Sequence, residues 1–145
     1  MRTVEREALV PYSAEAMYEL VNDIESYPGF LPWCRDARVL SRSENELTAS
    51  LSLAKGGIRK SFTTRNRMEP GRLIDIQLVD GPFRHLEGEW RFEPLREDAS
   101  KVKLDMRFEI SHGMLDAVFG PIFHQIGNSL VDAFVRRAND IHGRP

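Results

Sequence analysis

A strict two-residue alternation of apolar and polar side chains constrains the fold of this chain more than any other feature. Between Ser100 and Ile110 it runs without a break, and charged residues alternate with the apolar residues Val102, Leu104, Met106, Phe108 and Ile110. Successive side chains of a β-strand point to opposite faces, so this period predicts a strand with one apolar face. The segments 46–53 and 86–93 alternate in the same way.

Six consecutive strands are therefore expected, at residues 37–43, 46–53, 58–68, 73–79, 86–93 and 100–110. Short turn sequences such as Gly56-Gly57 and Pro70-Gly71 separate them. Alternating strands joined by short turns are typical of an antiparallel meander with one dry face. A further strand is expected at residues 2–10, where Pro11 ends it and Arg6 interrupts the apolar face.

Helical spacing replaces this alternation at two places. After Ser13, a suitable N-cap, apolar residues predict one short helix, and Asp23 begins a second that Pro28-Gly29 ends. From Met114 to Ile141 the apolar residues form one broad stripe centred near Ile126, which predicts a helix about 40 Å long. Pro121 lies inside this stripe and is expected to kink the helix just after Gly120.

The predicted order is strand, two short helices, six strands and one long helix, in a single α+β domain over residues 1–145. The dry face of the sheet needs a cover, and the long helix can supply it. We therefore expect a curved antiparallel sheet of about seven strands wrapped around the C-terminal helix. A gap between the two surfaces, lined by large apolar side chains, would suit a small molecule.

Composition and motifs exclude several classes of protein. A net charge of -2 rules out a globally basic nucleic-acid binder, and no run of about 18 apolar residues is present to span a membrane. The single cysteine, Cys34, cannot form an internal disulfide, and residues 1–7 do not resemble a signal peptide, so a cytoplasmic protein is expected. Zinc, phosphate-loop, dinucleotide and serine-nucleophile motifs are absent, so we expect no metal ligands and no catalytic residues.

One strand carries an uneven charge. Arg59, Arg65 and Arg67 share the outer face of the strand at 58–68, and three arginines in a row suit contact with phosphate groups. Alternatively, they form an ordinary solvated face whose charges pair across the sheet with Glu87, Glu89 and Glu93.

The inner face of the same strand carries two polar residues, Thr64 and Asn66, where buried polar groups need partners. They could satisfy backbone groups at a β-bulge or bind the polar head of a ligand. His85 follows the Gly81–Arg84 loop, where a plain loop histidine is more typical than a residue at a cavity mouth. Cys34 is more typical of a small buried side chain than of a reactive thiol.

Four stretches, Ala8–Ser13, Tyr27–Cys34, Lys60–Asn66 and Val79–Phe92, resemble one branch of the START-like (polyketide cyclase/dehydrase-like, helix-grip) superfamily. This branch holds coenzyme Q-binding proteins and ribosome-association toxins. The resemblance runs nearly end to end, and the Asp-Gly-Pro-Phe…Gly-x-Trp-x-Phe pattern within 80–92 is fairly specific to the branch. It implies the helix-grip (START/Bet v 1-like) fold and a protein that is not an enzyme; an enzyme would need an acid or base in the cavity, for which His85 is only a weak candidate.

The resemblance implies two activities. The first is binding of ubiquinone or another isoprenoid quinone, in support of respiratory electron transport, with no cofactor required. Thr64 or Asn66 would then bond a quinone carbonyl, in a cavity lined by Phe62, Thr64, Asn66, Trp90, Phe92, Met106, Phe108, Phe123, Ile126 and Leu130.

The alternative is a toxin of a toxin–antitoxin pair that binds the large ribosomal subunit through Arg59, Arg65 and Arg67. Such a protein would block subunit association and thus translation initiation. Peripheral contact with the inner membrane is a further option, because the apolar loops at Phe30-Leu31 and Pro82-Phe83 are expected to be exposed.

Overall fold

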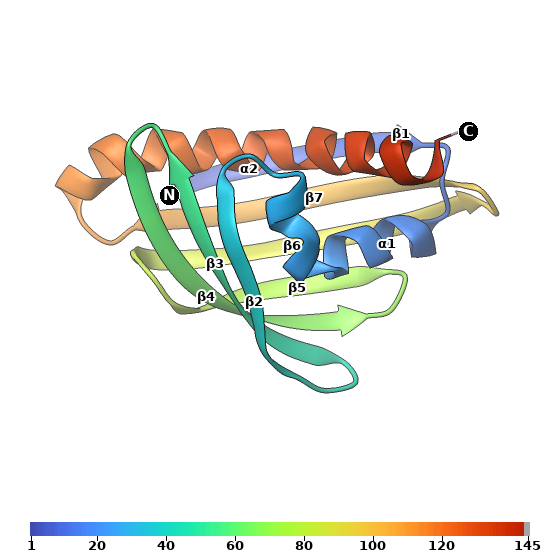
Figure 1. Ribbon diagram of the computed structural model, residues 1–145, viewed down its shortest axis with the longest axis horizontal. Coiled ribbons are helices and arrows are strands. Elements are labelled where there is room, and N and C mark those ends of the chain that lie inside the picture. The colour runs from blue at the N-terminus through green and yellow to red at the C-terminus, as the bar shows by residue number, and fades with distance from the viewer. Residues whose placement is uncertain (144–145) are drawn as a thin grey trace.

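Seven strands and one long helix account for most of the chain in the computed structural model, which describes residues 1–143 (Figure 1). The strands are β1 (Arg2–Val10), β2 (Cys34–Arg42), β3 (Glu46–Lys55), β4 (Ile58–Glu69), β5 (Leu73–Asp80), β6 (Phe83–Arg96) and β7 (Ala99–Ile110). The helices are α1 (Ala14–Asn22), the 3-10 helix η1 (Ile24–Gly29) and α2 (Gly113–His142). The predicted single domain spans residues 1–145, of which the last two lie outside the described part.

All seven strands form one antiparallel sheet in the order β1-β7-β6-β5-β4-β3-β2. The chain therefore builds β2 to β7 as a meander, and β1 joins the far edge by pairing with β7. In Figure 1, β5 to β7 run nearly along α2, whereas β2 to β4 cross them steeply, so the sheet curves around the helix. The predicted α+β helix-grip architecture is confirmed.

Sequence patterns located most element boundaries to within a few residues. Ser13 caps α1 as expected, since its Oγ accepts a hydrogen bond from the Ala16 amide at 3.1 Å. Asp23 makes no such cap for η1; its carboxylate instead accepts a hydrogen bond from the Ser26 hydroxyl at 2.6 Å. Strand β6 is longer than predicted, because register shifts after Phe83 and after Pro94 let both ends keep pairing with β7.

Helix α2 continues through Pro121 without interruption. The proline lacks an N–H group and leaves the carbonyl one turn before it without its helical partner, yet the helix runs on to His142. The kink expected after Gly120 stays a prediction. Arg6, the exception on β1, is explained by α2: it is exposed at the sheet edge and donates a hydrogen bond from Nε to Asn128 Oδ1 at 3.2 Å.

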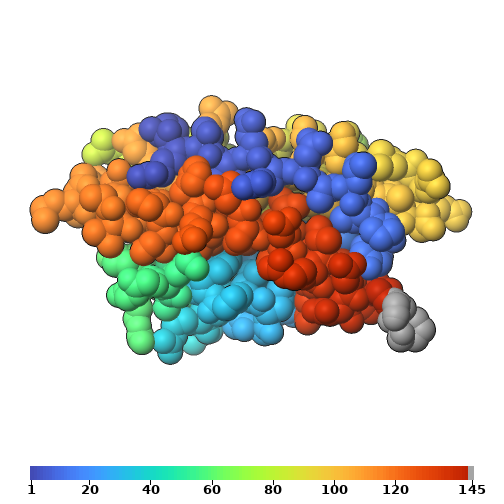
Figure 2. Space-filling model, turned by 90° about the horizontal axis from the view of Figure 1, so that it is seen from above, coloured from blue at the N-terminus to red at the C-terminus, as the bar shows by residue number. Residues whose placement is uncertain are grey.

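The core lies between the inner face of the sheet and the buried stripe of α2. Space-filling atoms of α2 and β1 cover one side of the molecule together (Figure 2). The two apolar loops expected to be exposed are only partly so. Leu31 is 1% exposed and Phe83 6% exposed, and both belong to this core, whereas Phe30 and Pro82 are half-buried. No helix in the described 143 residues is long and apolar enough to cross a membrane.

Candidate functional site

A small apolar cavity lies between the inner face of the sheet and α2. Its volume is about 90 Å³, and its walls come from η1, strands β3 to β7, α2 and the segment before β2. Eight residues predicted as cavity lining do line it: Phe62, Thr64, Asn66, Trp90, Met106, Phe123, Ile126 and Leu130. Alternation along each strand and helical spacing along α2 place these side chains on the inner surfaces.

Phe92 and Phe108 were also predicted to line the cavity, and they do not. Both side chains are fully buried, but neighbouring rings enclose them. Phe92 stacks beside Trp90 with ring centroids 6.3 Å apart, and Phe108 packs edge-on against Phe123 at 4.8 Å. The alternation correctly placed both on the dry face, but it carries no information on whether a dry-face residue meets a void or another ring.

Two polar side chains lie inside this apolar cavity. Thr64 is 7% exposed and Asn66 5% exposed, and the Thr64 hydroxyl donates a hydrogen bond to Asn66 Oδ1 at 3.0 Å. The register of β4 against β5 shifts between Thr63 and Thr64, where Val79 of β5 has no partner on β4, so the pairing is irregular at the place where one alternative expected a bulge. The two side chains nevertheless form a hydrogen bond with each other and not with backbone groups at this shift. The side-chain nitrogen of Asn66, Nδ2, donates no hydrogen bond within residues 1–143.

Residues that the sequence did not single out close one end of the cavity. Tyr27 and Trp33, from the aromatic segment between α1 and β2, line it together with Phe134 of α2. The Tyr27 hydroxyl donates to the Val21 carbonyl oxygen, and burial raises the pKa of this phenol far above its ordinary value. The sequence signal that could have identified these residues is the presence of three aromatic residues and two prolines within positions 27–33.

An aromatic wall separates this end of the cavity from an outer groove. Rings of Tyr27, Phe30 and Phe134 pack edge-on, with Phe134 5.4 Å from each of the other two. Arg137 lies over the outer side, with its guanidinium carbon 4.8 Å from the centre of the Phe30 ring. The groove beyond, of about 470 Å³, is lined by Phe30, Trp33 and Arg137 among others, so Trp33 borders both spaces.

Groups capable of acid–base chemistry lie elsewhere. Within the cavity lining Tyr27 is the one titratable side chain. His85, expected in a loop, lies on β6, where its Nε2 is 2.9 Å from Glu87 Oε1, and it does not line the cavity. Cys34 is buried as expected, and burial raises the pKa of its thiol to about 11. No group of three or more potential metal ligands occurs in the part of the chain that the structure describes.

The three arginines predicted as a row do share the exposed outer face of β4. Arg65 Nε lies 3.9 Å from Glu46 Oε1, and Arg67 Nε lies 3.2 Å from Glu46 Oε2, so two cations share one carboxylate of β3. Arg59 forms no ion pair with any described residue. The row thus keeps a net positive charge.

The expected pairing of this row with three glutamates of β6 (Glu87, Glu89 and Glu93) is wrong. Strand β5 lies between β4 and β6, which puts those carboxylates two strands away. Glu87 instead neighbours His85 and Arg107, and Glu89 pairs with Arg91 at 2.7 Å. Turn signals show that strands follow one another, but they do not specify which charged side chains face one another across the finished sheet.

Comparison with known proteins finds both similar sequences and a similar solved structure. Residues 10–135 match the family described as "Polyketide cyclase / dehydrase and lipid transport". The "Ribosome association toxin RatA" of Vibrio cholerae is 48% identical over 143 residues, 99% of either chain. The "Coenzyme Q-binding protein COQ10 homolog B, mitochondrial" of Xenopus laevis is 31% identical over 140 residues, 92% of this chain and 56% of the relative. The solved Zhui aromatase/cyclase of Streptomyces sp. R1128 shares the fold, with a TM-score of 0.82, 19% identity and coverage of 95% and 93% of the two chains.

Proposed function

Since the chain belongs to the START-like polyketide cyclase/dehydrase and lipid transport family, we propose that it works by binding and that its main partner is the ribosome. The proposal has no catalytic step and needs no cofactor. It is supported by the cavity lining, where a buried tyrosine hydroxyl with a raised pKa is the one ionisable group. Such a phenol stays protonated near neutral pH and makes a poor general base.

The observation that carries the proposal is the row of Arg59, Arg65 and Arg67 on the outer face of β4, with one carboxylate for two of the three. Guanidinium groups match phosphate oxygens in geometry and charge, as the RNA backbone of a ribosome requires. A relative with 48% identity over 99% of its length is named a ribosome association toxin. By this proposal the chain binds the large subunit, prevents it from joining the small one and so inhibits translation initiation.

The test is co-sedimentation of the purified protein with large ribosomal subunits at several salt concentrations. The parent should pellet with the subunits and be released as salt rises, because freed counterions drive such contacts. The double variant Arg65→Glu/Arg67→Glu should lose co-sedimentation while keeping its melting temperature.

The matched control is Arg91→Glu/Arg107→Glu, on the outer face of β6 and β7. Its side chains are 52% and 64% exposed, against 53% and 74% for the test pair. If the test variant sediments as well as the parent, β4 is not the ribosome contact. If the control loses as much binding, the effect is one of overall charge and not of this row.

A second candidate function, binding of an isoprenoid quinone in support of respiration, is favoured by Thr64 and Asn66. Two buried polar side chains in an otherwise apolar cavity can orient a ligand that has one polar head. A quinone carbonyl would accept a hydrogen bond from Asn66 Nδ2, because the Thr64 hydroxyl already donates to Asn66 Oδ1. The cavity of about 90 Å³ is well below the roughly 300 Å³ of ordinary ligand sites. Binding would therefore require the wall of Tyr27, Phe30 and Phe134 to move.

Titration with a short-chain ubiquinone, followed by tryptophan fluorescence, tests this candidate, because Trp33 and Trp90 both line the cavity. Thr64→Val/Asn66→Leu should weaken binding about fivefold, since removing the one hydrogen bond to the ligand costs about 1 kcal/mol. The control Thr63→Val alters the outer face of the same strand and should bind like the parent. Absence of saturable binding by the parent, together with no quinone in lipid extracts of the purified protein, would exclude the candidate.

A further inference from the structure

The first turns of α2 present an apolar face to solvent. The exposed residues between positions 113 and 121 are Gly113, Met114, Ala117, Val118 and Pro121, and none of them carries a polar side chain. Met114 is 86% exposed and Val118 51% exposed. Further along the same helix the exposed positions are mostly polar, as at Asp132, Arg136 and Asp140. We call the exposed residues Met114, Ala117, Val118 and Pro121 the α2 tip.

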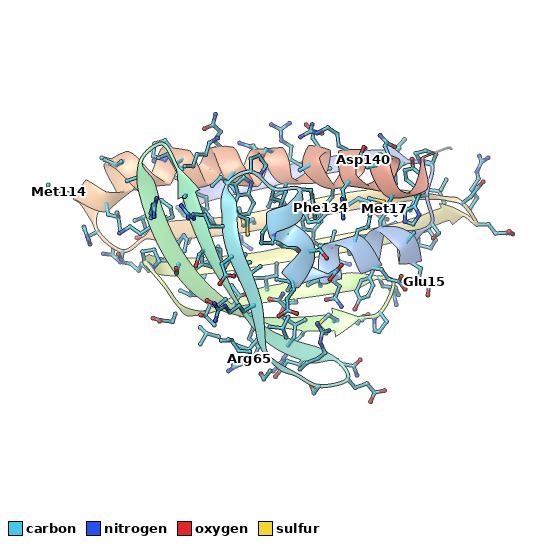
Figure 3. The ribbon with its side chains drawn as sticks, in the orientation of Figure 1. Glu15, Met17, Arg65, Met114, Phe134 and Asp140 are labelled. Atoms are coloured by element: carbon cyan, nitrogen blue, oxygen red, sulfur yellow. The ribbon has the colours of Figure 1, made fainter. Side chains whose placement is uncertain are left out.

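Nothing in the described structure covers the α2 tip. Figure 3 shows Met114 at the free end of the helix, pointing away from the body and far from Arg65. The acid of this segment, Asp116, is only partly exposed, and Arg2 Nε lies 3.4 Å from its Oδ1. Exposed apolar side chains gathered on one helix face are typical of a surface that a partner covers.

The turn between β3 and β4 brings cations to the side of this face. A Cβ atom on Gly56 would lie 3.2 Å from Ile122 Cδ1, so the turn touches the third turn of α2. In Figure 2, green atoms of this part of the chain lie beside orange atoms of the start of α2. Lys55, Arg59 and Lys60 flank the turn, and none of the three forms an ion pair with residues 1–143.

We propose that the α2 tip and the cations of the β3–β4 turn together dock the protein on an anionic lipid bilayer. Apolar side chains on one helix face insert at the boundary between headgroups and acyl chains, and neighbouring lysine and arginine side chains are attracted to anionic headgroups. An RNA partner would satisfy the cations but leave Met114 and Val118 in water. An apolar protein surface would cover the tip but leave the cations without a counter-charge.

The test is co-sedimentation of the purified full chain with vesicles of phosphatidylcholine alone and of phosphatidylcholine mixed with phosphatidylglycerol. The parent should bind the anionic vesicles, and less so as salt rises. Met114→Asp/Val118→Asp should lower the apparent partition coefficient about tenfold or more, because burial of these side chains is lost. Acids near a helix N-terminus are electrostatically favourable, so the fold should persist, as circular dichroism will show.

The matched control is Leu40→Asp/Leu95→Asp, because these leucines of β2 and β6 are 58% and 54% exposed. It should bind like the parent, whereas Lys55→Gln/Lys60→Gln should lose the preference for anionic vesicles. The proposal is overturned if the parent binds neither kind of vesicle, or if the α2 tip variant binds like the parent. Two further outcomes, in which the parent binds no vesicles, also overturn it. Loss of self-association by the tip variant would assign the α2 tip to a second copy of the chain, and loss of co-sedimentation with ribosomes would assign it to the ribosome.

Discussion

At the scale of single residues, Cys34 shows how burial changes the chemistry of a side chain. It begins β2, it is 4% exposed, and its Sγ donates a weak hydrogen bond to the Asp36 carbonyl oxygen at 3.5 Å. Burial raises the pKa of the thiol from its ordinary value of 9.0 to about 11, because the thiolate loses its hydration. The protonated form is a weak nucleophile, which agrees with a structural role.

This shift predicts a stability that falls in alkaline solution. Below pH 9 the thiol is protonated in both the folded and the unfolded chain, so it has no effect there. Between pH 9 and about 11 the unfolded chain loses the proton first, and the free energy of unfolding should fall by about 1 kcal/mol per pH unit.

Urea titrations of the parent and of Cys34→Ala at pH 8 and at higher pH measure this contribution. The comparison is kept below pH 10, the ordinary pKa of a phenol, because the Cys34 thiolate also raises the pKa of Tyr27 and the tyrosine effects would not cancel between the two proteins. The variant should show a shallower decline than the parent, and equal declines would mean that the thiol is not responsible.

At the scale of elements, Gly127 sets how closely α2 lies on the sheet. It is buried in the middle of the helix, and a Cβ atom there would come within 2.6 Å of Met106 Cε and 3.0 Å of Val4 Cγ2. The glycine thus allows close contact of α2 with β1 and β7. The same position lies on the cavity wall, so helix packing and cavity size depend on one residue.

Gly127→Ala should therefore destabilise the protein by about 1–2 kcal/mol through overpacking. In an open helical position the same change would stabilise by up to about 1 kcal/mol. Gly113→Ala in the first turn of α2 is the control, because nothing lies within 4 Å of its added Cβ. Chemical unfolding of the two variants should give effects of opposite sign, and a stabilised Gly127→Ala would show that Val4 and Met106 move aside at little cost.

At the scale of the whole molecule, the two proposed functions use opposite faces of the same strand. Arg65 and Arg67 point outward from β4, while Thr64 and Asn66 point into the cavity. The net charge of -2 gives no sign of how unevenly the charges are distributed. Cations gather on β4 and the β3–β4 turn, whereas the acids Asp75, Glu89 and Asp105 face one another across β5, β6 and β7.

The separation predicts that the two activities are independent. Arg65→Glu/Arg67→Glu should bind the short-chain quinone like the parent, and Thr64→Val/Asn66→Leu should sediment with ribosomes like the parent. The reason is that the two pairs of side chains lie on opposite faces of the sheet and share no hydrogen bond or ion pair. Both measurements on both variants complete the comparison. A variant that changes both activities would instead indicate that ligand in the cavity alters the outer face of the sheet.

Much of this protein was determined by its sequence alone. The two-residue period and the turn residues identified the strands, and the apolar stripe identified α2, because local geometry repeats along the chain. The same period placed Thr64 and Asn66 on the inner face and the arginines on the outer face before any neighbour was known. A side chain's face depends only on its place in its own strand, so local pattern is sufficient to predict it.

Only the tertiary structure decided which residues meet. The pairing of β1 with β7 and of Glu46 with two arginines depends on contacts between segments far apart in the sequence. The cavity depends on how rings from several elements fill a shared space. For this reason Trp33 lines the cavity, although it was not predicted to, and Phe92 does not, although it was. Periodicity records the face that a residue occupies, whereas depth and neighbours arise from the packing of the whole chain.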